Sequence, residues 1–530
     1  MRLDRQYSRR AVRPALVLAV AVMILLGAGT DRAQQAGRSQ ILEAMKRATV
    51  FMVEKVSTNG GYVWSYLPDL SRRWGEMEAR DTQVWIQPPG TPTMGHLFLD
   101  AYHATGDEYY YQCAEKVAGA LIWGQHPAGG WNYVVDFAGD RSLRDWYATV
   151  GRNGWRLEEF QYYRGNATFD DAGTAQASKF LLRLYTEKRN PAYRPALDRA
   201  IQFVLESQYP IGAWPQRFPL KSEFAHQGKP DYTSYLTFND DVAAENIDFL
   251  VMCYQALGDP RLLDPINRGM NAFLVTQQGQ PQPGWGLQYT PDLKPVGART
   301  YEPDALVTHT TARNLELLIQ FYRLTGETKF LARIPEAIDW LERVTLPASV
   351  AGQGRTHPTF VAIGTNKPLF VHREGSNVEN GRYYANGNPE NTLAHYGSFR
   401  RIDVAGLRTQ YAEAKALRPA EAAKDSPLRP GAGLSRLAKY FAVDQRASAT
   451  ADSVISSLNA EGYWLVPLGT NSHPYRGKGS ATPAPGDFSR THVGDETDTS
   501  PFPDDKIVGI STAAYVRNMS VLIRSLNGTR

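Results

Sequence analysis

Two acidic stretches, "TFDD" at 168–171 and "TFNDD" at 237–241, stand immediately before runs with helical apolar spacing. Each places two carboxylates, Asp170-Asp171 and Asp240-Asp241, where a helix is predicted to begin. Acids in a first turn complement the helix dipole, and Asn239 is a good N-cap, so capping alone could explain both stretches. Carboxylates are also metal ligands and acid–base catalysts. The role depends on whether the two helices bring their N-termini together.

Basic residues gather in the segments that separate the predicted helices. Such residues are usually solvated, but an arginine can also bind a carboxylate through parallel hydrogen bonds, and an aromatic ring offers a flat surface to a sugar. A cleft with these groups would suit a polyanionic sugar chain. The candidates are Arg299, three residues before Glu302, then Arg217 and Lys221 beside Trp214, and finally Lys367 and Arg373 in a predicted loop over 365–376.

The elements that would position these residues recur along the chain. Four similar segments, "NGGYVWSY", "HPAGGWNY", "YPIGAWPQ" and "PQPGWGLQ", contain glycines at 61, 130, 212 and 284. Between them lie pairs of apolar helical patterns joined by a turn such as Gly-Asp, and a glycine after a periodic run is a helix stop. Recurrence of this kind is typical of repeat architectures. We therefore predict an all-α fold, an α/α toroid (an incomplete barrel) of repeated helical hairpins.

The repeat also predicts where the candidate residues lie. If the Gly-aromatic loops open at one end of the toroid, Trp131, Trp214 and Trp285 share one rim, and the helices after Asp171 and Asp241 open at the same mouth. Carboxylates that converge there need a cation or a substrate to offset their charge. Oxygen ligands without Cys or His suit Ca²⁺ best, and the sequence contains no EF-hand loop.

The N-terminus has the features of a secretory signal. Arg9, Arg10 and Arg13 precede the apolar run 15–26, which is too short to span a bilayer comfortably, and small residues follow it. We predict a signal peptide over 1–33, with a faint twin-arginine pattern, and one domain over 38–530. The protein is expected to be exported to the periplasm or secreted, with no membrane segment after cleavage.

Charge and cysteine content narrow the class of protein. The whole formal net charge of +4 lies within residues 1–33, so the rest of the chain has no global basic field that would attract nucleic acid. Cys113 and Cys253 could pair in an oxidising compartment or remain two buried thiols, and they form no metal-ligand cluster. A monomer is expected.

The stretch "GAWPQRFPL…YLTFNDDVAAENIDFL" closely resembles the segment typical of polysaccharide lyase family 10, the pectic acid lyases. Three other stretches, "TFDDAGTAQ", "ARTYEPDAL" and "AIGTNKPLFVHREG", resemble family stretches in the same order, so the similarity spans roughly 160–375. The sequence departs from the family at Asp171 (Asn in the family), at Ala172-Gly173 (Gly-Ala), at Ala213 (Gly) and at Lys367 (Arg).

The resemblance implies an incomplete α/α toroid that cleaves polygalacturonate by Ca²⁺-dependent β-elimination. It makes Arg299 the candidate base, although arginine is normally always protonated. It assigns Asp170, Asp240 and Asp241 to the Ca²⁺ site and the acidic cleft, and Arg373 to a uronate carboxylate. Trp214, Arg217, Lys221 and Lys367 are the further candidates for contact with the acidic polysaccharide.

Three other functions stay open. An inverting glycoside hydrolase on the same toroid would need two of the acids roughly 6.5–9.5 Å apart. The Gln…Trp pattern of "QHPAGGW" suggests a terpene-cyclase-like protein, but Thr168 stands where its acidic motif needs an acid, and the signal peptide argues against this class. A non-catalytic protein would bind oligouronides while the acids served only as helix caps.

Overall fold

The structure is a computed structural model, and it describes residues 37–528 apart from 156, 222–230, 353, 377–380, 394–395, 445, 447, 470, 478–496 and 502–506. The signal peptide predicted over 1–33 therefore lies outside the described residues. Within the described ranges, none of the helices combines the length and the apolar character that a membrane crossing requires.

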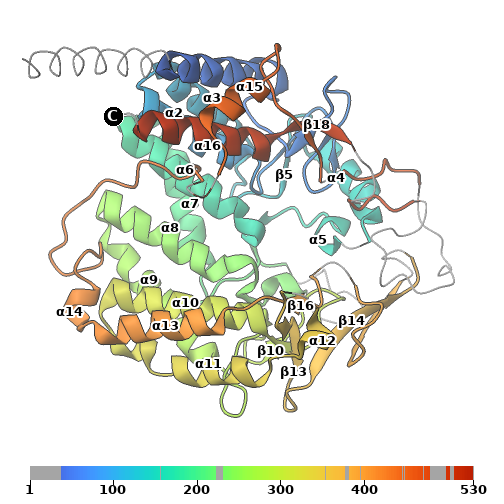
Figure 1. Ribbon diagram of the computed structural model, residues 1–530, viewed down its shortest axis with the longest axis vertical. Coiled ribbons are helices and arrows are strands. Elements are labelled where there is room, and N and C mark those ends of the chain that lie inside the picture. The colour runs from blue at the N-terminus through green and yellow to red at the C-terminus, as the bar shows by residue number, and fades with distance from the viewer. Residues whose placement is uncertain are drawn as a thin grey trace, which may run out of the picture.

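Helical hairpins stacked side by side form the body of the protein (Figure 1). In each hairpin an inner helix packs against the outer helix that follows it. The pairs are α2 (Thr91–Thr105) with α3 (Glu108–Gly124), α6 (Gly173–Lys188) with α7 (Arg194–Ser207), α8 (Val242–Leu257) with α9 (Leu263–Thr276), and α10 (Thr308–Thr325) with α11 (Ile334–Arg343). The inner helices α2, α6 and α8 also pack on one another in that order, and α10 packs on α9.

In the part of the chain that the structure describes, the row of hairpins stays open rather than closing into a ring. α16 (Thr512–Gly528) packs on α2, and α13 (Val404–Ala416) packs on α10 and α11. Figure 1 shows these two helices at opposite ends of the molecule. The predicted all-α, incomplete α/α toroid is therefore confirmed. A helix over 37–51 and the shorter helices α4 (Asp140–Thr149), α12 (Ala348–Ala351), α14 (Pro419–Ala422) and α15 (Ala451–Ser457) add to this frame.

Burial separates the inner helices from the outer ones. α8 is buried around most of its circumference, because neighbouring elements cover it on several sides. α9 buries a single face, with Ile266, Met270 and Phe273 at helical spacing. Cys113 on α3 and Cys253 on α8 are both buried and unpaired, so the disulfide alternative is not realised.

The turns inside the hairpins confirm the stop signals of the sequence. Gly106, Gly258 and Gly326 follow α2, α8 and α10 in the left-handed conformation, which glycine adopts without a Cβ clash. After the first two of these turns, the side chains of Asp107 and Asp259 each accept a hydrogen bond from the backbone N–H two residues further on. Such a bond fixes the start of the next helix.

The tryptophans of the Gly-aromatic loops anchor each loop to a helix. Each indole N–H donates to a carbonyl of the outer helix that precedes it: Trp131 to Leu121 at 2.8 Å, Trp214 to Val204 at 2.8 Å and Trp285 to Phe273 at 3.1 Å. All three rings are fully buried. They occupy equivalent places in the repeat, as expected, but they lie inside the protein. The carbonyl acceptor satisfies the indole N–H of each buried ring.

Short antiparallel strands lie at the end of the molecule where the inner helices begin. Three sheets contain β17 (Leu465–Pro467), β18 (Val508–Ser511), β1 (Ser65–Tyr66), β2 (Arg73–Trp74) and β3 (Glu78–Ala79); β4 (Gln83–Trp85) and β5 (Val134–Asp136); and β6 (Ala167–Thr168) and β7 (Arg217–Phe218). Three more contain β10 (Pro295–Val296), β9 (Gln288–Tyr289) and β8 (Leu236–Thr237); β11 (Ala305–Val307), β13 (Phe360–Ala362), β14 (Pro368–Glu374) and β15 (Arg382–Asn386); and β12 (His357–Pro358) and β16 (Phe399–Arg400). This end therefore collects the N-termini of the inner helices.

The prediction of a loop over 365–376 is wrong for most of these residues. Strand β14 occupies residues 368–374 and pairs with β15, with Arg373 opposite Tyr383. Burial is continuous from Phe370 to Arg373, so the alternation that marks a half-buried strand is missing from the sequence. Lys367 alone of the predicted site residues lies in the turn before the strand.

At the opposite end of the inner helices, the segment 431–444 ties neighbouring hairpins together. The Asp100 carboxylate accepts the backbone N–H groups of Phe441, Ala442 and Val443 and pairs with Arg183 at 2.8 Å. A cavity of about 520 Å³ lies against this segment. Since the 16 residues of α6 run from the acidic turn to this end, roughly 24 Å separates the cavity from the acids.

Candidate active site

Two matched turns carry the acids that precede α6 and α8. These turns, η3 (Asp170–Ala172) and η6 (Asn239–Asp241), pack on each other. In each of them two consecutive residues, Asp171-Ala172 and Asp240-Asp241, are left-handed, with φ from 48° to 57°. That conformation costs a non-glycine residue on the order of 1–3 kcal/mol. Neither of these fully described turns supplies a side-chain hydrogen bond that caps its helix, so the prediction of a side-chain N-cap is wrong, although the acids do lie in the first turn.

Asp170 lies deepest in the site and is fully buried. Its Oδ2 atom accepts a hydrogen bond from the Tyr133 hydroxyl at 2.6 Å and another from Arg299 Nη2 at 2.7 Å. Burial acts to raise the pKa of Asp170, but the charge of Arg299 and the hydrogen bonds outweigh it and lower the pKa. The other oxygen, Oδ1, is buried and accepts no hydrogen bond from the described residues. Asp170 is thus an ionised carboxylate, and its Oδ1 atom lies enclosed next to the Asp240 carboxyl.

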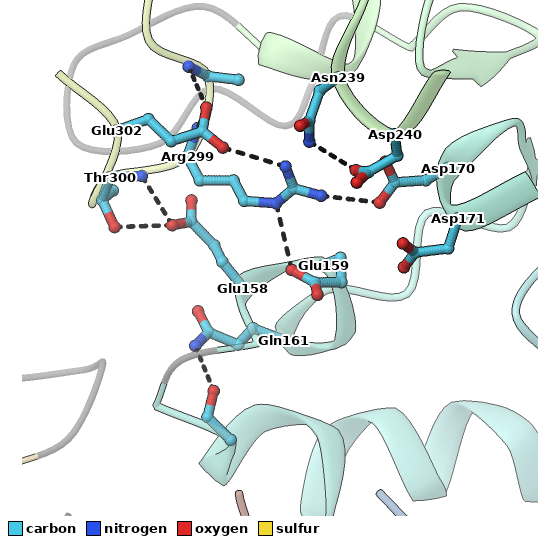
Figure 2. A network of polar contacts seen from close by, with 12 residues as sticks. Glu158, Glu159, Gln161, Asp170, Asp171, Asn239, Asp240, Arg299, Thr300 and Glu302 are labelled. Atoms are coloured by element: carbon cyan, nitrogen blue, oxygen red, sulfur yellow. Dashed lines mark hydrogen bonds and ion pairs between the residues drawn. The ribbon is translucent and has the colours of Figure 1, made fainter. Parts of the chain in front are cut away.

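Arg299 stands at the centre of the polar network in Figure 2. Its guanidinium pairs with three carboxylates: Nη2 with Asp170 at 2.7 Å, Nη1 with Glu302 at 3.1 Å, and Nε with Glu159 at 3.3 Å. Burial disfavours the charge, but Tyr396 and Asp170 outweigh this effect and raise the pKa of Arg299 well above its usual value. The free protein therefore holds Arg299 charged, which opposes proton acceptance in this state.

Two buried glutamates hold the loop that carries Arg299. Glu302 Oε2 accepts the backbone N–H groups of Ala298 and Arg299, at 2.8 and 3.1 Å. Glu158 Oε2 accepts the backbone N–H of Thr300 at 2.8 Å and its hydroxyl at 2.7 Å. These bonds fix the direction of Arg299 before any ligand binds, as a preorganised site requires.

Glu158 and Glu159 were not recognised as site residues from the sequence. They begin the one-turn helix α5 (Glu158–Gln161), and both are buried. The stretch "RLEEFQ" is too short to show a period, and adjacent acids usually lie on the surface, so no local signal distinguishes this pair. Burial, only partly offset by the charge of Arg299, raises the pKa of Glu159 to about 7. Glu159 can therefore hold or release a proton near neutral pH.

Asp171, Asp240 and Glu76 complete a group with Asp170 and Glu159 that we call the acid cluster. Burial and the charge of Asp170 raise the pKa of Asp171 to about 6. Asp240 is exposed at the mouth of the site, and partial desolvation of its carboxyl, with the charges of Asp171 and Asp170, raises its pKa well above the usual value. Burial and Asp171 do the same to the pKa of Glu76. One guanidinium therefore does not neutralise the acid cluster.

The acid cluster has the donor chemistry of a Ca²⁺ site. Every donor is a carboxylate oxygen, including the buried Asp170 Oδ1, and hard oxygen ligands suit Ca²⁺. Within the described ranges, no three His, Cys, Asp or Glu side chains are close enough together to hold a metal ion as they stand. The residues fit the ion chemically, and binding would require a side-chain movement or an oxygen supplied by the ligand.

Asp241 faces away from the acid cluster. Its carboxylate pairs with Arg313 Nε on α10 at 3.0 Å, where both side chains are partly exposed. Asp240, its neighbour, instead accepts a hydrogen bond from Asn239 and points toward Arg299 (Figure 2). The predicted pair is thus split: Asp240 belongs to the acid cluster, Asp241 does not, and Asp171 takes the place that was expected of Asp241.

Two predicted substrate-binding residues support the site from inside the protein. Arg217 donates to the side-chain oxygens of Asn166 and Asn132, both at 3.1 Å, and lies 5.0 Å from the centre of the Tyr133 ring. It therefore steadies the tyrosine that binds Asp170. Trp214 is fully buried and has no exposed face for a sugar ring.

The other three predicted residues do not meet at the acid cluster. Arg373 is buried and stacks on Trp155, with 3.8 Å between the guanidinium and the ring centre, so a uronate could reach it only if this packing opened. Lys367 is exposed at the far end of β14, roughly 20 Å along the strand from Arg373. Lys221 is half-buried at the edge of the described segment 157–221.

The raised pKa of Glu159 predicts a pH-dependent gain in stability for Glu159→Gln. The folded protein keeps a proton on Glu159 up to about pH 7, whereas the unfolded chain releases it near the ordinary value of 4.5. Ionised Glu159 therefore destabilises the fold increasingly as the pH rises from 4.5 to 7, by up to a few kcal/mol. The Tm difference between Glu159→Gln and wild type should move in favour of the variant over this interval and then level off.

The lost contact with Arg299 in Glu159→Gln adds an offset at every pH, so the change in the difference is the informative quantity. Exposed Glu54, which pairs with Lys116, provides a matched control as Glu54→Gln. A Tm difference for Glu159→Gln that stays constant from pH 4.5 to 8 would contradict the assignment.

The fold and the site first define a general class. An open helical toroid that gathers ionisable groups of opposed pKa shift at one mouth has the layout of an enzyme. Residues 150–384 match the model of the pectic acid lyase family, and this segment contains Arg299, Glu158, Glu159 and both acidic turns. The resemblance to polysaccharide lyase family 10 is thereby confirmed for these residues, and it supports a polysaccharide lyase.

Solved structures offer looser likenesses. A mutant family 10 polysaccharide lyase from Cellvibrio cellulosa, in complex with trigalacturonic acid, is 17% identical, with 62% of this chain and 99% of that chain covered and a TM-score of 0.41. Cellobiose 2-epimerase from Spirochaeta thermophila is 11% identical, with 94% and 98% covered and a TM-score of 0.43. No curated protein is significantly similar to the chain. These likenesses are too distant to carry a statement about function.

Proposed function

We propose that the protein is an exported, Ca²⁺-dependent pectate lyase that cleaves polygalacturonate by β-elimination to unsaturated oligogalacturonides. The observation that carries the proposal is the position of Arg299, which lies buried at the edge of the acid cluster and is held by Asp170, Glu159 and Glu302. A fixed cation next to ionisable carboxylates suits a substrate that carries one carboxylate per sugar. Export follows from the substrate, because a long polyanion does not cross a membrane unaided.

The reaction removes the proton on C5 of a uronate; the electrons of the C5–H bond form the C4–C5 double bond, and the electrons of the C4–O bond leave with the oxygen. The departing oxygen takes a proton from water. Negative charge grows on the uronate carboxylate in the transition state, so a nearby cation lowers the barrier. Arg299 is the described cation best placed to do this, and its preorganised loop lets it act without rearrangement.

The identity of the base follows from which group can be unprotonated at the working pH. For Arg299 to accept the C5 proton, as the family resemblance implies, substrate binding would first have to remove some of its ion pairs. Glu159 contacts Arg299 and titrates near neutral pH, so it can exchange a proton with the site without that cost. The two roles of Arg299 differ in pH dependence and can therefore be separated by experiment.

Asp170, Asp171 and Asp240 would hold the cation, with Asp170 Oδ1 as the buried donor. A Ca²⁺ ion bound there would supply positive charge to the uronate carboxylate and so acidify the C5 proton. Tyr133 and Arg217 would keep Asp170 in place.

The direct test is the ultraviolet absorbance of the C4–C5 double bond during incubation with polygalacturonate. We expect absorbance to rise with the purified protein, to stop when a chelator is added, and to return with Ca²⁺. Mg²⁺ should restore less activity, because it demands a tighter octahedral shell and gives up its waters reluctantly. Full activity in excess chelator would remove the metal from the proposal, and absence of absorbance on any uronan would remove the lyase.

An inverting glycoside hydrolase is the second candidate, and one observation favours it. The acid cluster combines Asp170, whose pKa is lowered, with Glu159, whose pKa is raised to about 7, and such a division marks a base and an acid. A hydrolase would release reducing ends without the double bond. Reducing-end formation in the absence of any ultraviolet signal would therefore decide for it.

A further inference from the structure

Asp171 is held by a residue that lies outside the segment matched to the family. Gln87, in the loop between β4 and α2, donates from its Nε2 atom to Asp171 Oδ2 at 2.6 Å and to Glu76 Oε2 at 3.0 Å. The matched segment begins at residue 150, so Gln87 and Glu76 belong to the preceding part of the chain. That part had no assigned role.

The orientation of the Gln87 amide is fixed by a donor that cannot act as an acceptor. The indole N–H of Trp85 donates to Gln87 Oε1, and an indole nitrogen can only donate, so the amide N–H groups must face the carboxylates. The Trp64 indole also donates to the backbone oxygen of Gln87, at 3.0 Å. Gln87 is only 1% exposed, so little freedom remains to its side chain.

The same loop lies beside the turn that carries Asp171. A Cβ atom placed on Gly173, at the first position of α6, would lie 3.5 Å from Ile86 and 3.6 Å from the Gln87 nitrogen. Asp171 itself is left-handed, so its side chain is directed by a backbone that needs support from its neighbours. The hydrogen bond from Gln87 is therefore a contact that can hold the acid in place.

We propose that Gln87 is a positioning residue of the active site, which holds the Asp171 carboxylate within the acid cluster and so makes residues before 150 part of the catalytic centre. This inference rests on the proposed lyase function. A hydrogen bond to a charged group contributes about ten- to hundred-fold in an equilibrium, so loss of Gln87 should cost activity by a factor in that range.

Gln83 provides a matched control in the same segment. It is fully buried and lies in β4, and both ends of its amide are hydrogen-bonded, as in Gln87. Nε2 donates to Asp136 at 3.0 Å, and Oε1 accepts from the backbone N–H of Arg80 at 2.9 Å. Asp136 is not in the acid cluster. Gln83→Met and Gln87→Met therefore remove equivalent buried amides, and only the second should affect chemistry.

The experiment is a double-mutant cycle in the full chain. We measure kcat and KM on polygalacturonate, and Tm on the same preparations. Gln87→Met should lower kcat about ten- to hundred-fold with little change in KM, while Gln83→Met should lower Tm by several degrees and leave kcat within about two-fold. Gln87→Met should cost much less in an Asp171→Asn background, because the residue acts mainly through Asp171 and only its hydrogen bond to Glu76 remains to be lost. Equal losses in both backgrounds, or equal losses for the two glutamines, would overturn the proposal.

A second variant and a binding titration cover the other outcomes. If Gln87→Met does not fold, Gln87→Glu keeps the acceptor for Trp85 but lacks the amide donors, and the same cycle applies. If wild type binds trigalacturonate without cleaving any uronan, the lyase proposal fails and the cycle is scored on affinity. A wild-type protein that neither binds nor cleaves overturns both proposals.

Discussion

Arg299→Ala is expected to lower kcat on polygalacturonate by at least about 100-fold, which is the usual loss when one preorganised donor to a developing anion is removed. Arg299 pairs with Asp170, Glu302 and Glu159 in a buried site, so its loss removes the cation that all three carboxylates contact. Arg299→Lys should fail almost as badly, because an ammonium group cannot reproduce the planar fork. Initial rates by ultraviolet absorbance, with KM from the same data, provide the measurement.

Arg313→Ala is the matched control for this experiment. Arg313 also pairs with an acid of the two turns, Asp241, but the pair is partly exposed and lies outside the acid cluster. Its loss should leave kcat within about two-fold, since exposed ion pairs contribute little. An Arg299→Ala protein with most of its turnover would remove Arg299 from the mechanism and, with it, the observation that carries the lyase proposal.

The pH dependence of wild-type kcat separates the two roles of Arg299. If Arg299 accepts the C5 proton, kcat should keep rising into the alkaline range, because deprotonation of a guanidinium limits the rate. If Arg299 stays charged and Glu159 exchanges the proton, kcat should level off above about pH 7, and Glu159→Gln should remove that titration.

Asp170→Asn is expected to reduce kcat about 100-fold or more while the protein remains folded. The substitution keeps the shape of the side chain but removes the charge that faces Arg299, and the amide nitrogen that replaces one oxygen cannot bind a cation. Stability should change little, because Glu159 and Glu302 still compensate Arg299 and the repulsion among the remaining acids decreases. Rates and Tm of the same preparation give both quantities.

Asp241→Asn tests the division of the acids that the structure makes. Asp170 and Asp241 both lie in acidic turns before inner helices, yet only Asp170 contacts Arg299. Asp241→Asn should keep kcat within about two-fold, as expected for loss of an exposed pair. Equal losses for Asp170→Asn and Asp241→Asn would mean that the turns act as units and that the direction of each side chain is irrelevant.

The sequence by itself determined the helical frame. The glycines after α2, α8 and α10 and the recurring Gly-Trp loops are local signals, because a left-handed turn and a buried indole each need a particular residue at a particular spacing. The same holds for the acidic turns, which the sequence placed correctly at the starts of two inner helices, and for the family motif around Arg299.

Only the tertiary structure decided which acids meet. Asp240 and Asp241 are adjacent and both left-handed, and their side chains contact different partners. The residue types alone do not predict this difference. Glu159 on α5 and Glu76 near β3 come from elements with no motif of their own. Their place beside Asp171 depends on how these elements pack.

The tryptophan rings and Arg373 show the same limit. Trp214 is an aromatic residue in a loop, as a sugar-binding surface requires, but its ring lies in the interior, where its N–H donates to the carbonyl of Val204. Arg373 is covered because β14 is buried on both faces. A sequence specifies turns and periods through neighbouring residues, whereas burial and convergence depend on contacts between distant segments, and those contacts exist only once the hairpins have packed.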